Sequence, residues 1–278
     1  DLLVKSRSNE RDVVIQGSGT TSVVVVEGGS FIELEGLTIT GGNGSYGAGV
    51  TVDGSSLTVR NSMIRNNSAT LYGAGVYIKK AEETAGGEAG ELFLVDSELE
   101  NNSAVFWESC IYVGGGCKAV LERCIFRGNT TGIAGGCNYV GGQAQLYLAN
   151  CLFVENQVKS SVVAHAVGGI VQAVNVTCTN NLAGSPRSFE LQSGSSLWLS
   201  NSILWNGGAE ILSDATSTTE VQWSLLQNTA VSGEGIFTSD PLFASPADGD
   251  YHLLEGSPCI DAGCGLDAPL LDYEGNER

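Results

Sequence analysis

Apolar and polar residues alternate in a short segment that recurs along most of the chain. The segment reads LTVRNSMIRNN at residues 57–67, and apolar side chains occupy its third and eighth positions in every copy. This alternation is typical of β-strands, in which successive side chains point to opposite faces. Similar segments lie at residues 32–42, 92–102, 119–129, 146–156, 171–181, 197–207 and 219–229. We therefore expect the third and eighth positions to form two apolar columns inside a repetitive β-structure.

The repeat period indicates the architecture. Most successive copies lie 25–27 residues apart, and one interval of 35 residues contains a polar, glycine-rich insertion at residues 79–91. A period in this range fits either a leucine-rich repeat or a parallel β-helix. Each period contains three strand-like segments and no helical segment, which favours the parallel β-helix. The sequence thus predicts an all-β solenoid of about eight to ten coils over residues 1–229.

The last part of the chain, residues 230–278, departs from the repeat. Its prolines at positions 241, 246 and 258 indicate irregular structure. We expect this part to be a C-terminal capping segment that packs on the last coil. Repeat stacks need caps at both ends, and the strand pattern is already present at residue 2, so we also expect an N-terminal coil or cap to be missing.

Asparagine recurs at the eleventh position of the repeat. The residues are Asn67, Asn102, Asn129, Asn156 and Asn181. Stacked asparagine amides can hydrogen-bond to one another and to the backbone of the neighbouring coil. We therefore interpret this column as a structural ladder and not as a binding site.

The third strand-like segment predicts one inward and one outward column. The inward column is expected to contain Val50, Val76, Ile111, Asn138 and His165. Tyr77, Tyr112 and Tyr139 follow three of these residues and should face outward, where Ala166 is expected to continue their column. Adjacent coils are ~4.8 Å apart, so the three tyrosines should form an exposed ladder.

The charge of the chain restricts its partners. It carries 13 Lys and Arg against 31 Asp and Glu, which gives a formal net charge of −18. Binding to phosphates requires Lys and Arg side chains, so nucleic acid and anionic membrane surfaces are poor partners. No apolar run reaches the ~20 residues of a membrane span. The remaining expected partners are other extracellular proteins or polysaccharide.

Several motifs resemble those of a known group. The segments GLTITGG at residues 36–42 and GAGVTVDGSSLTVRNSMIRNNSA at residues 47–69 look like repeats of right-handed parallel β-helix proteins. The closest likeness is to polymorphic outer-membrane-protein repeats and to secreted proteins of the pectate-lyase-like superfamily. The tail motifs DPLF, DYHL and SPCIDAG resemble the segment that closes many such proteins. The resemblance implies a right-handed solenoid, an extracellular or cell-surface location, and a fragment of a larger surface or appendage protein.

The register of the repeat pairs four of the eight cysteines. Cys124 and Cys151 occupy the same position in successive coils, and so do Cys110 and Cys137. Their Cβ atoms should lie ~5 Å apart, slightly beyond the usual disulfide range, so each pair is either a disulfide or a buried thiol stack. Cys259 and Cys264 are candidates for a disulfide that closes a small loop in the tail, whereas Cys117 and Cys178 have no evident partner.

Candidate catalytic and metal-binding residues are scattered. A polysaccharide lyase needs a basic residue, but Arg123 lies one coil from Asp96, which indicates a surface ion pair. The two histidines, His165 and His252, lie in different parts of the chain. The carboxylates of the Asp248-Gly-Asp250 turn suit Ca²⁺, although the spacing is short and common and a tight turn explains it better. We expect no catalytic group, no metal site other than this candidate for Ca²⁺, and no other cofactor.

The tyrosine ladder is the best candidate for binding. Aromatic faces stack on sugar rings and on apolar protein surfaces, although ladders also stabilise sheets by cross-strand packing. A second, sparser aromatic face is expected from Phe93, Tyr147 and Trp198. If the protein is a secreted glycoprotein, five sequons offer acceptor asparagines at Asn43, Asn66, Asn101, Asn129 and Asn175.

These observations leave three hypotheses about function. The leading one is an extracellular structural or adhesive β-helix that binds glycan or protein. The alternative is a polysaccharide-active enzyme, a lyase or a glycoside hydrolase, which rests on the family resemblance. The third is a carbohydrate-binding module that uses the tyrosine ladder.

Overall fold

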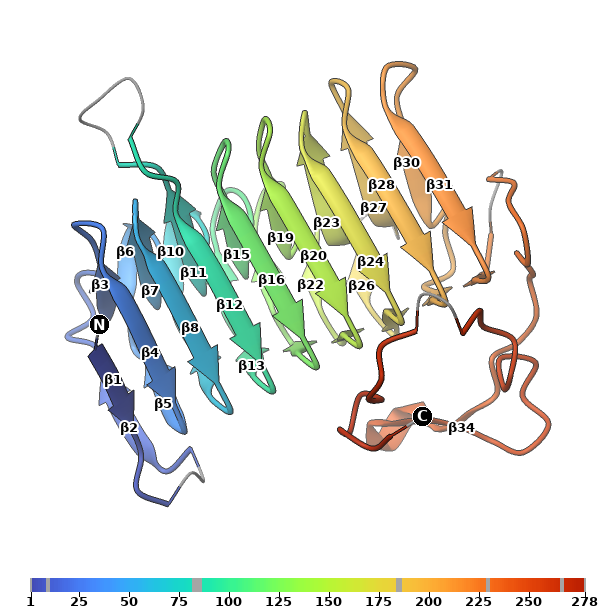
Figure 1. Ribbon diagram of the computed structural model, residues 1–278, viewed down its shortest axis with the longest axis horizontal. Coiled ribbons are helices and arrows are strands. Elements are labelled where there is room, and N and C mark those ends of the chain that lie inside the picture. The colour runs from blue at the N-terminus through green and yellow to red at the C-terminus, as the bar shows by residue number, and fades with distance from the viewer. Residues whose placement is uncertain are drawn as a thin grey trace.

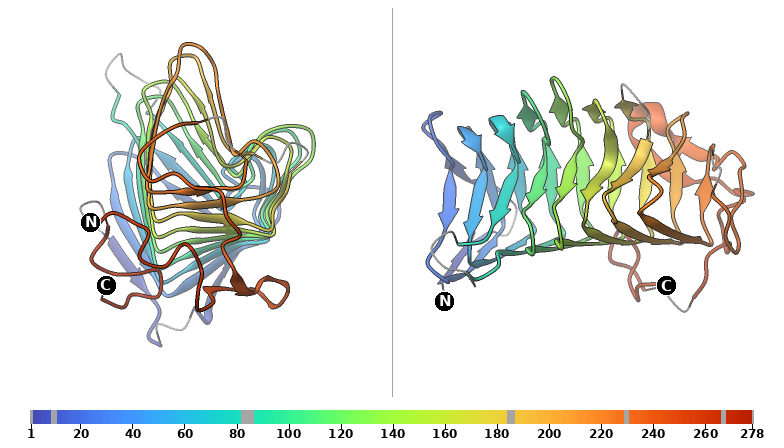
Figure 2. Two further views of the ribbon diagram at one scale, coloured as in Figure 1. Left: turned by 90° about the vertical axis from the view of Figure 1, so that its right-hand side faces the viewer. Right: turned by 90° about the horizontal axis from the view of Figure 1, so that it is seen from above.

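The computed structural model describes residues 2–8, 11–81, 87–183, 187–228, 231–265 and 268–277. It shows an all-β parallel solenoid of about eight turns, which confirms the predicted fold class (Figure 1). Each turn adds one strand to each of the long parallel sheets, and the turns superimpose when viewed along the coil axis (Figure 2). Among the described residues, no helix has the length and apolar character needed to cross a bilayer.

Two of the sheets are built from the repeated segment. Sheet A consists of β1 (Leu2–Lys5), β4 (Phe31–Glu35), β8 (Ser56–Arg60), β12 (Glu91–Val95), β16 (Lys118–Glu122), β20 (Gln145–Ala149), β24 (Ile170–Val174), β28 (Ser196–Ser200) and β31 (Thr218–Gln222). Sheet B consists of β2 (Val13–Gln16), β5 (Leu37–Thr40), β9 (Met63–Arg65), β13 (Glu98–Glu100), β17 (Ile125–Arg127), β21 (Leu152–Val154), β25 (Thr177–Thr179), β29 (Ile203–Trp205) and β32 (Leu225–Leu226).

The rest of each turn forms two sheets, one more than expected. Sheet D, which the sequence analysis did not anticipate, consists of β6 (Asn43–Tyr46), β10 (Ser68–Tyr72), β14 (Ser103–Ala104), β18 (Thr130–Thr131), β22 (Gln157–Val158) and β26 (Leu182–Ala183). Sheet C consists of β3 (Val24–Val26), β7 (Val50–Asp53), β11 (Val76–Lys79), β15 (Ile111–Val113), β19 (Asn138–Val140), β23 (Ser161–Val167), β27 (Arg187–Gln192) and β30 (Ile211–Ser213).

The bend between sheets A and B explains the asparagines at the fifth position of the repeat. Residues at this position adopt left-handed φ values, such as 42° at Asn61 and 53° at Asn150. Asparagine tolerates this conformation better than most residues. The bend lets one strand follow another after two residues in most coils, and it turns the third and eighth positions toward the same interior. Both apolar columns are buried as predicted, and Phe126 stacks on Phe153 with ring centroids 4.3 Å apart.

The asparagine ladder is confirmed. Asn102 Nδ2 donates to Asn129 Oδ1 at 3.2 Å and to the carbonyl of Ile64 at 2.9 Å. Its own Oδ1 accepts hydrogen bonds from the backbone and side-chain nitrogens of Asn67. The same pattern continues through Asn156 and Asn181. Each amide thereby joins adjacent coils at a buried corner where water cannot satisfy the backbone.

The predicted register of sheet C is wrong at its sixth strand, β23. His165 pairs with Tyr139 and Ala166 pairs with Val140, so Asn138 has Ala164 and not His165 as its neighbour. Strand β23 has seven residues and its pairing with β27 shifts register between Ser161 and Ala164. This irregularity moves every later side chain to the opposite face. His165 therefore extends the outward column of tyrosines, and Ala166 is buried.

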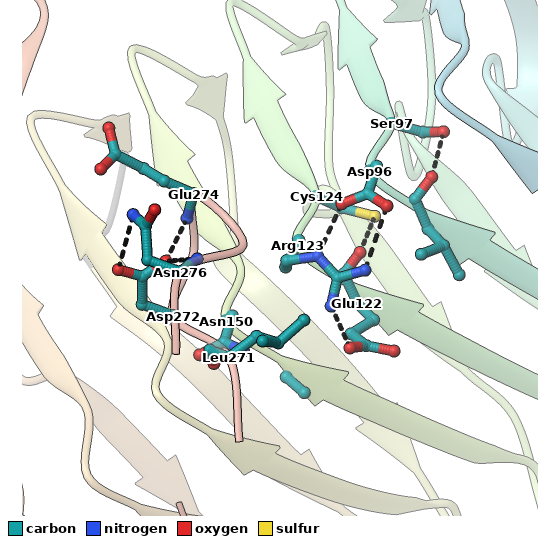
Figure 3. Close-up of polar contacts among 12 residues, drawn as sticks. Asp96, Ser97, Glu122, Arg123, Cys124, Asn150, Leu271, Asp272, Glu274 and Asn276 are labelled. Carbon is teal, nitrogen blue, oxygen red and sulfur yellow. Dashed lines mark hydrogen bonds and ion pairs between the residues drawn. The ribbon is translucent and has the colours of Figure 1, made fainter. Parts of the chain in front are cut away.

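The tail contacts the last coil and then folds back. A parallel bridge joins Leu225 of the final turn to Phe237. Beyond it, β33 (Phe243–Ser245), the 3₁₀ turn η1 (Pro246–Asp248) and β34 (Asp250–Leu253) lie beside the solenoid (Figure 1). Asn150 Nδ2 donates to the carbonyl of Leu271 at 3.0 Å (Figure 3). In the insertion at residues 79–91, residues 82–86 lie outside the described part of the chain.

Candidate functional site

The outward column of sheet C holds the tyrosine ladder. The paired residues along this column are Thr51, Tyr77, Tyr112, Tyr139, His165, Glu190 and Leu212. The ring centroids of Tyr77 and Tyr112 are 4.9 Å apart, and so are those of Tyr112 and Tyr139. The predicted ladder therefore exists, and each of its rings is half-buried.

A second row of rings lies against the ladder. Tyr46 ends β6, Tyr72 ends β10, and Trp107 follows β14. Tyr72 stacks between Tyr46 and Trp107, with centroid distances of 5.8 and 6.2 Å. It also contacts Tyr112 of the first row at 5.0 Å. The two rows form one surface, which we call the aromatic platform, of Tyr46, Tyr72, Tyr77, Trp107, Tyr112 and Tyr139.

The second row was not predicted, although the sequence contains a signal for it. Tyr72 and Trp107 each precede a ladder tyrosine by five residues, in the segments YGAGVY and WESCIY. In both segments the intervening residues are buried and turn the chain from sheet D into sheet C. A recurring spacing of two aromatic residues across a turn indicates that both project to the same side. The most exposed members are Tyr46 and Trp107, at 44% and 40%.

A buried carboxylate lies at the platform. Glu108 is 1% exposed, and neither of its carboxylate oxygens has a hydrogen-bond partner among the described residues. Its Oε1 atom is 3.9 Å from Nδ1 of His165, whose two ring nitrogens are likewise without a partner in the described structure. Burial, and then the negative charge of Glu108, raise the pKa of Tyr139 and of Tyr72. The platform therefore lies in a negative field.

A second carboxylate near the ladder, that of Glu190 in the outward column, is fully engaged. Glu190 accepts hydrogen bonds from Ser160 Oγ at 2.7 Å and from Gln192 Nε2 at 2.9 Å, and Arg187 lies 3.3 Å away. Burial acts to raise the pKa of Glu190, but the hydrogen bond from Ser160 and the other partners lower it below its usual value. Glu108 is thus the unusual group here, because it is more deeply buried and unsatisfied.

The residues considered for catalysis form ion pairs instead. Arg123 binds Asp96 through two hydrogen bonds of 2.6 and 3.0 Å and also contacts Glu122, as Figure 3 shows. This confirms the predicted ion pair. The hydrogen bonds that Arg123 donates to Asp96 raise the pKa of its guanidinium, which therefore holds its proton firmly.

The candidate Ca²⁺ ligands are engaged by neighbouring side chains. Asp250 Oδ1 lies 2.6 Å from His252 Nδ1, and the hydrogen bonds from the His252 backbone and ring lower the pKa of Asp250. Asp248 accepts a hydrogen bond from Ser245 Oγ at 2.6 Å. Within the described ranges, no group of three or more His, Cys, Asp or Glu residues is arranged to hold a metal ion.

The structure shows eight free cysteines, so the disulfide alternative is not borne out for Cys110–Cys137, Cys124–Cys151 or Cys259–Cys264. The first two pairs form buried thiol stacks. Neighbouring parallel strands hold stacked Cβ atoms too far apart for a relaxed disulfide. Cys124 instead contacts the carbonyl oxygens of Leu94 and Glu122 at 3.3 Å. Burial, and then the neighbouring thiols, raise the pKa values of Cys124 and Cys137.

The candidate glycosylation sites differ in accessibility. Asn43, Asn66 and Asn101 are exposed, and the last two adopt left-handed conformations at corners of the coil. Asn175 is partly exposed, and its Nδ2 donates to Asn150 Oδ1 at 3.0 Å. Asn129 belongs to the buried asparagine ladder. A glycan on Asn129 is therefore incompatible with the folded structure.

Sheet A carries the second aromatic face. Tyr147 and Trp198 flank Gln172 in one outward column, in which Phe93 lies two strands earlier. A groove of about 480 Å³ runs over these strands and is also lined by Glu122. Its two rings are separated by a strand, whereas those of the platform are in contact.

Comparison with protein-family models finds no match, and neither does comparison with curated proteins or with solved structures. The parallel solenoid is shown, but the resemblance to polymorphic outer-membrane-protein repeats or to pectate-lyase-like proteins gains no support at the level of the family. Any functional assignment therefore rests on the surface chemistry of the platform.

Proposed function

We propose that this chain is an extracellular adhesive β-helix that binds a glycan through the aromatic platform. The observation that supports this proposal is the continuous contact of six aromatic rings across neighbouring coils, which begins at Tyr46 and ends at Tyr139. Aromatic faces are large, rigid surfaces that stack on flat apolar faces such as those of sugar rings. The repeat places one ladder ring on each of three successive coils, which suits a ligand that itself repeats.

The rigidity of the scaffold favours binding. The ladder strands β11, β15 and β19 pair in register with one another, and the asparagine ladder fixes the adjacent corners. Rings held in this way lose little further conformational entropy when a ligand stacks on them. By contrast, the groups at the platform that can transfer protons, Glu108 and His165, are 3.9 Å apart and are not hydrogen-bonded to each other.

A binding comparison between two faces tests the proposal. The Tyr77→Ala, Tyr112→Ala and Tyr139→Ala triple variant removes the ladder, and the Tyr147→Ala, Trp198→Ala double variant removes the rings of sheet A. Each stacking contact contributes about 0.5–1.5 kcal/mol, so the triple variant should bind at least about tenfold more weakly. Retention is measured on cellulose, chitin, chitosan and polygalacturonate, and circular dichroism confirms that each variant is folded.

The double variant should retain the affinity of the unmodified protein. Equal retention of glycan by the triple variant and the unmodified protein would remove the platform from consideration. Loss of retention in the double variant alone would transfer the function to the groove of sheet A.

A further inference from the structure

The unsatisfied carboxylate of Glu108 calls for an explanation beyond stacking. An ionised carboxylate that is buried without a hydrogen-bond partner costs several kcal/mol. Among the described residues, the Glu108 carboxylate is buried without a hydrogen-bond partner, whereas the other buried acid, Glu210, accepts three hydrogen bonds. Such a cost is tolerated where the group has a role in binding or catalysis.

The surroundings of Glu108 point to a positively charged ligand. The faces of aromatic rings are electron-rich and attract cations, with an energy of about 0.5–2 kcal/mol for each cation. Two cations near the ladder are held by other acids, since Lys79 binds Asp53 at 2.8 Å and Arg187 binds Glu190. Glu108 lies close to both rows of the platform. It directly follows Trp107 of the second row, and its Oε1 atom is 3.9 Å from His165, whose ring contacts Tyr139 at a centroid distance of 5.7 Å.

The same arrangement disfavours an anionic ligand. A uronate polymer on the platform would meet the negative ring faces and the charge of Glu108, on a chain with a formal net charge of −18. Interactions with a buried charge are screened little by salt, whereas those with exposed charges are screened strongly. Glu108 can therefore select ligands by charge even where the general acidity of the surface has no effect.

We infer that the aromatic platform binds a polysaccharide whose sugars carry cationic amino groups, with Glu108 as the buried counter-charge that selects it. This inference rests on the proposed function, since it names the ligand class of the same surface. Glu108 does not touch the ligand in this arrangement. It acts through the rings of Tyr72, Tyr112 and Tyr139, over which the cationic groups would lie.

The test compares two oligomers of equal length. One is an N-trimethylated glucosamine oligomer, whose charge is permanent, and the other is the neutral N-acetylated oligomer, both at neutral pH. We expect the unmodified protein to bind the cationic oligomer at least about tenfold more tightly, since one cation on a desolvated ring face contributes up to about 2 kcal/mol. Glu108→Gln should remove most of this preference and leave the affinity for the neutral oligomer unchanged.

A matched control separates Glu108 from the overall charge. Glu220→Gln removes the same charge from the outward column of sheet A and should keep the preference. Equal losses of the preference in the two variants would overturn the inference.

A second measurement does not depend on the folding of a variant. At about 1 M salt, where the Debye length is about 3 Å, the preference of the unmodified protein should persist. Its disappearance would assign the preference to exposed charges and overturn the inference.

The outcomes also separate this inference from the proposed function. Equal binding of both oligomers, with loss of both in the triple tyrosine variant, would support the platform as a glycan site and overturn selection by charge. Binding of the cationic oligomer that does not require the tyrosines would overturn both proposals. The absence of binding to either oligomer would overturn this inference alone, because retention on cellulose and polygalacturonate tests the proposed function separately.

Discussion

The asparagine ladder and the aromatic platform follow the same coils, but they differ in how their polar groups are satisfied. Inside the wall, Asn102 uses its amide to bond the coil before it and the coil after it. On the outside, the platform covers Glu108, whose two carboxylate oxygens lack partners among the described residues. Both ladders arise from the same repeat, so repetition alone does not separate a structural ladder from a functional one.

The difference identifies which ladder serves the fold. A buried polar group that bonds its neighbours contributes to stability, whereas one that lacks partners reduces it. The asparagine ladder should therefore contribute more to the free energy of unfolding than the platform, which should contribute less than its large rings suggest. Four predictions follow this comparison from the largest expected effect to the smallest.

Asn102→Ala should cause the largest loss of stability. It leaves partners of the amide, among them the carbonyl of Ile64, buried without hydrogen bonds, and each such group costs about 1–3 kcal/mol. We expect the free energy of unfolding to fall by about 3 kcal/mol or more. Asn101→Gly is the matched control, because Asn101 is exposed and has a φ of 52° that glycine adopts freely. Urea unfolding of both variants checks the difference, and equal losses would contradict it.

Tyr112→Ala should cost less than Asn102→Ala although it removes a larger side chain. Tyr112 contacts Tyr72, Tyr77 and Tyr139, but it remains partly exposed. The lost ring contacts predict a decrease of about 2 kcal/mol in the free energy of unfolding. A decrease larger than that of Asn102→Ala, measured in the same urea titrations, would show that the ladder serves the fold first.

Many of the structural features compared here can be predicted from the sequence. The asparagine ladder, the tyrosine ladder and the pair Arg123–Asp96 all follow from register, because a parallel stack places equivalent positions side by side. His165 could not be placed in this way, since strand β23 contains an irregularity that shifts the register by one residue. Glu108 could not be singled out either, because its lack of partners depends on side chains from several coils.

The return of the tail along the solenoid was also beyond the sequence pattern. Asn150 bonds Leu271, and Asn201 bonds the backbone of Cys264, across separations of 121 and 63 residues. These contacts use asparagines that the repeat places at several of the bends between sheets A and B. A local pattern shows that such side chains are available, but it does not show which distant segment will occupy them.

Glu108→Gln and Glu190→Gln should change stability in opposite directions. Replacing the unpaired carboxylate of Glu108 by a neutral amide removes the cost of a buried charge, and should raise the free energy of unfolding by about 1 kcal/mol. The same change at Glu190 weakens its contacts with Ser160, Gln192 and Arg187, and should lower it by about 1 kcal/mol. Thermal unfolding at neutral pH measures both. Destabilisation by Glu108→Gln would indicate that this carboxylate already has a partner.

The smallest expected effect concerns pH and the acid at the end of the asparagine ladder. Glu210 is buried and accepts a hydrogen bond of 2.7 Å from the backbone of Asn206, and burial raises its pKa above the usual value of 4.5. The folded state therefore binds a proton that the unfolded state releases in the window from pH 4.5 up to the raised pKa. The contribution of Glu210 to stability is fully present below this window and is lost as the pH rises through it.

Urea unfolding of the unmodified protein and of Glu210→Gln at a series of pH values checks this prediction. Relative to the variant, the unmodified protein should lose free energy of unfolding across the window and show no further change above it. A pH-independent difference in the free energy of unfolding between the two proteins would mean that the hydrogen bonds from Ser188 and Asn206 cancel the effect of burial. Glu210 would then resemble the hydrogen-bonded asparagines of the ladder more closely than it resembles Glu108.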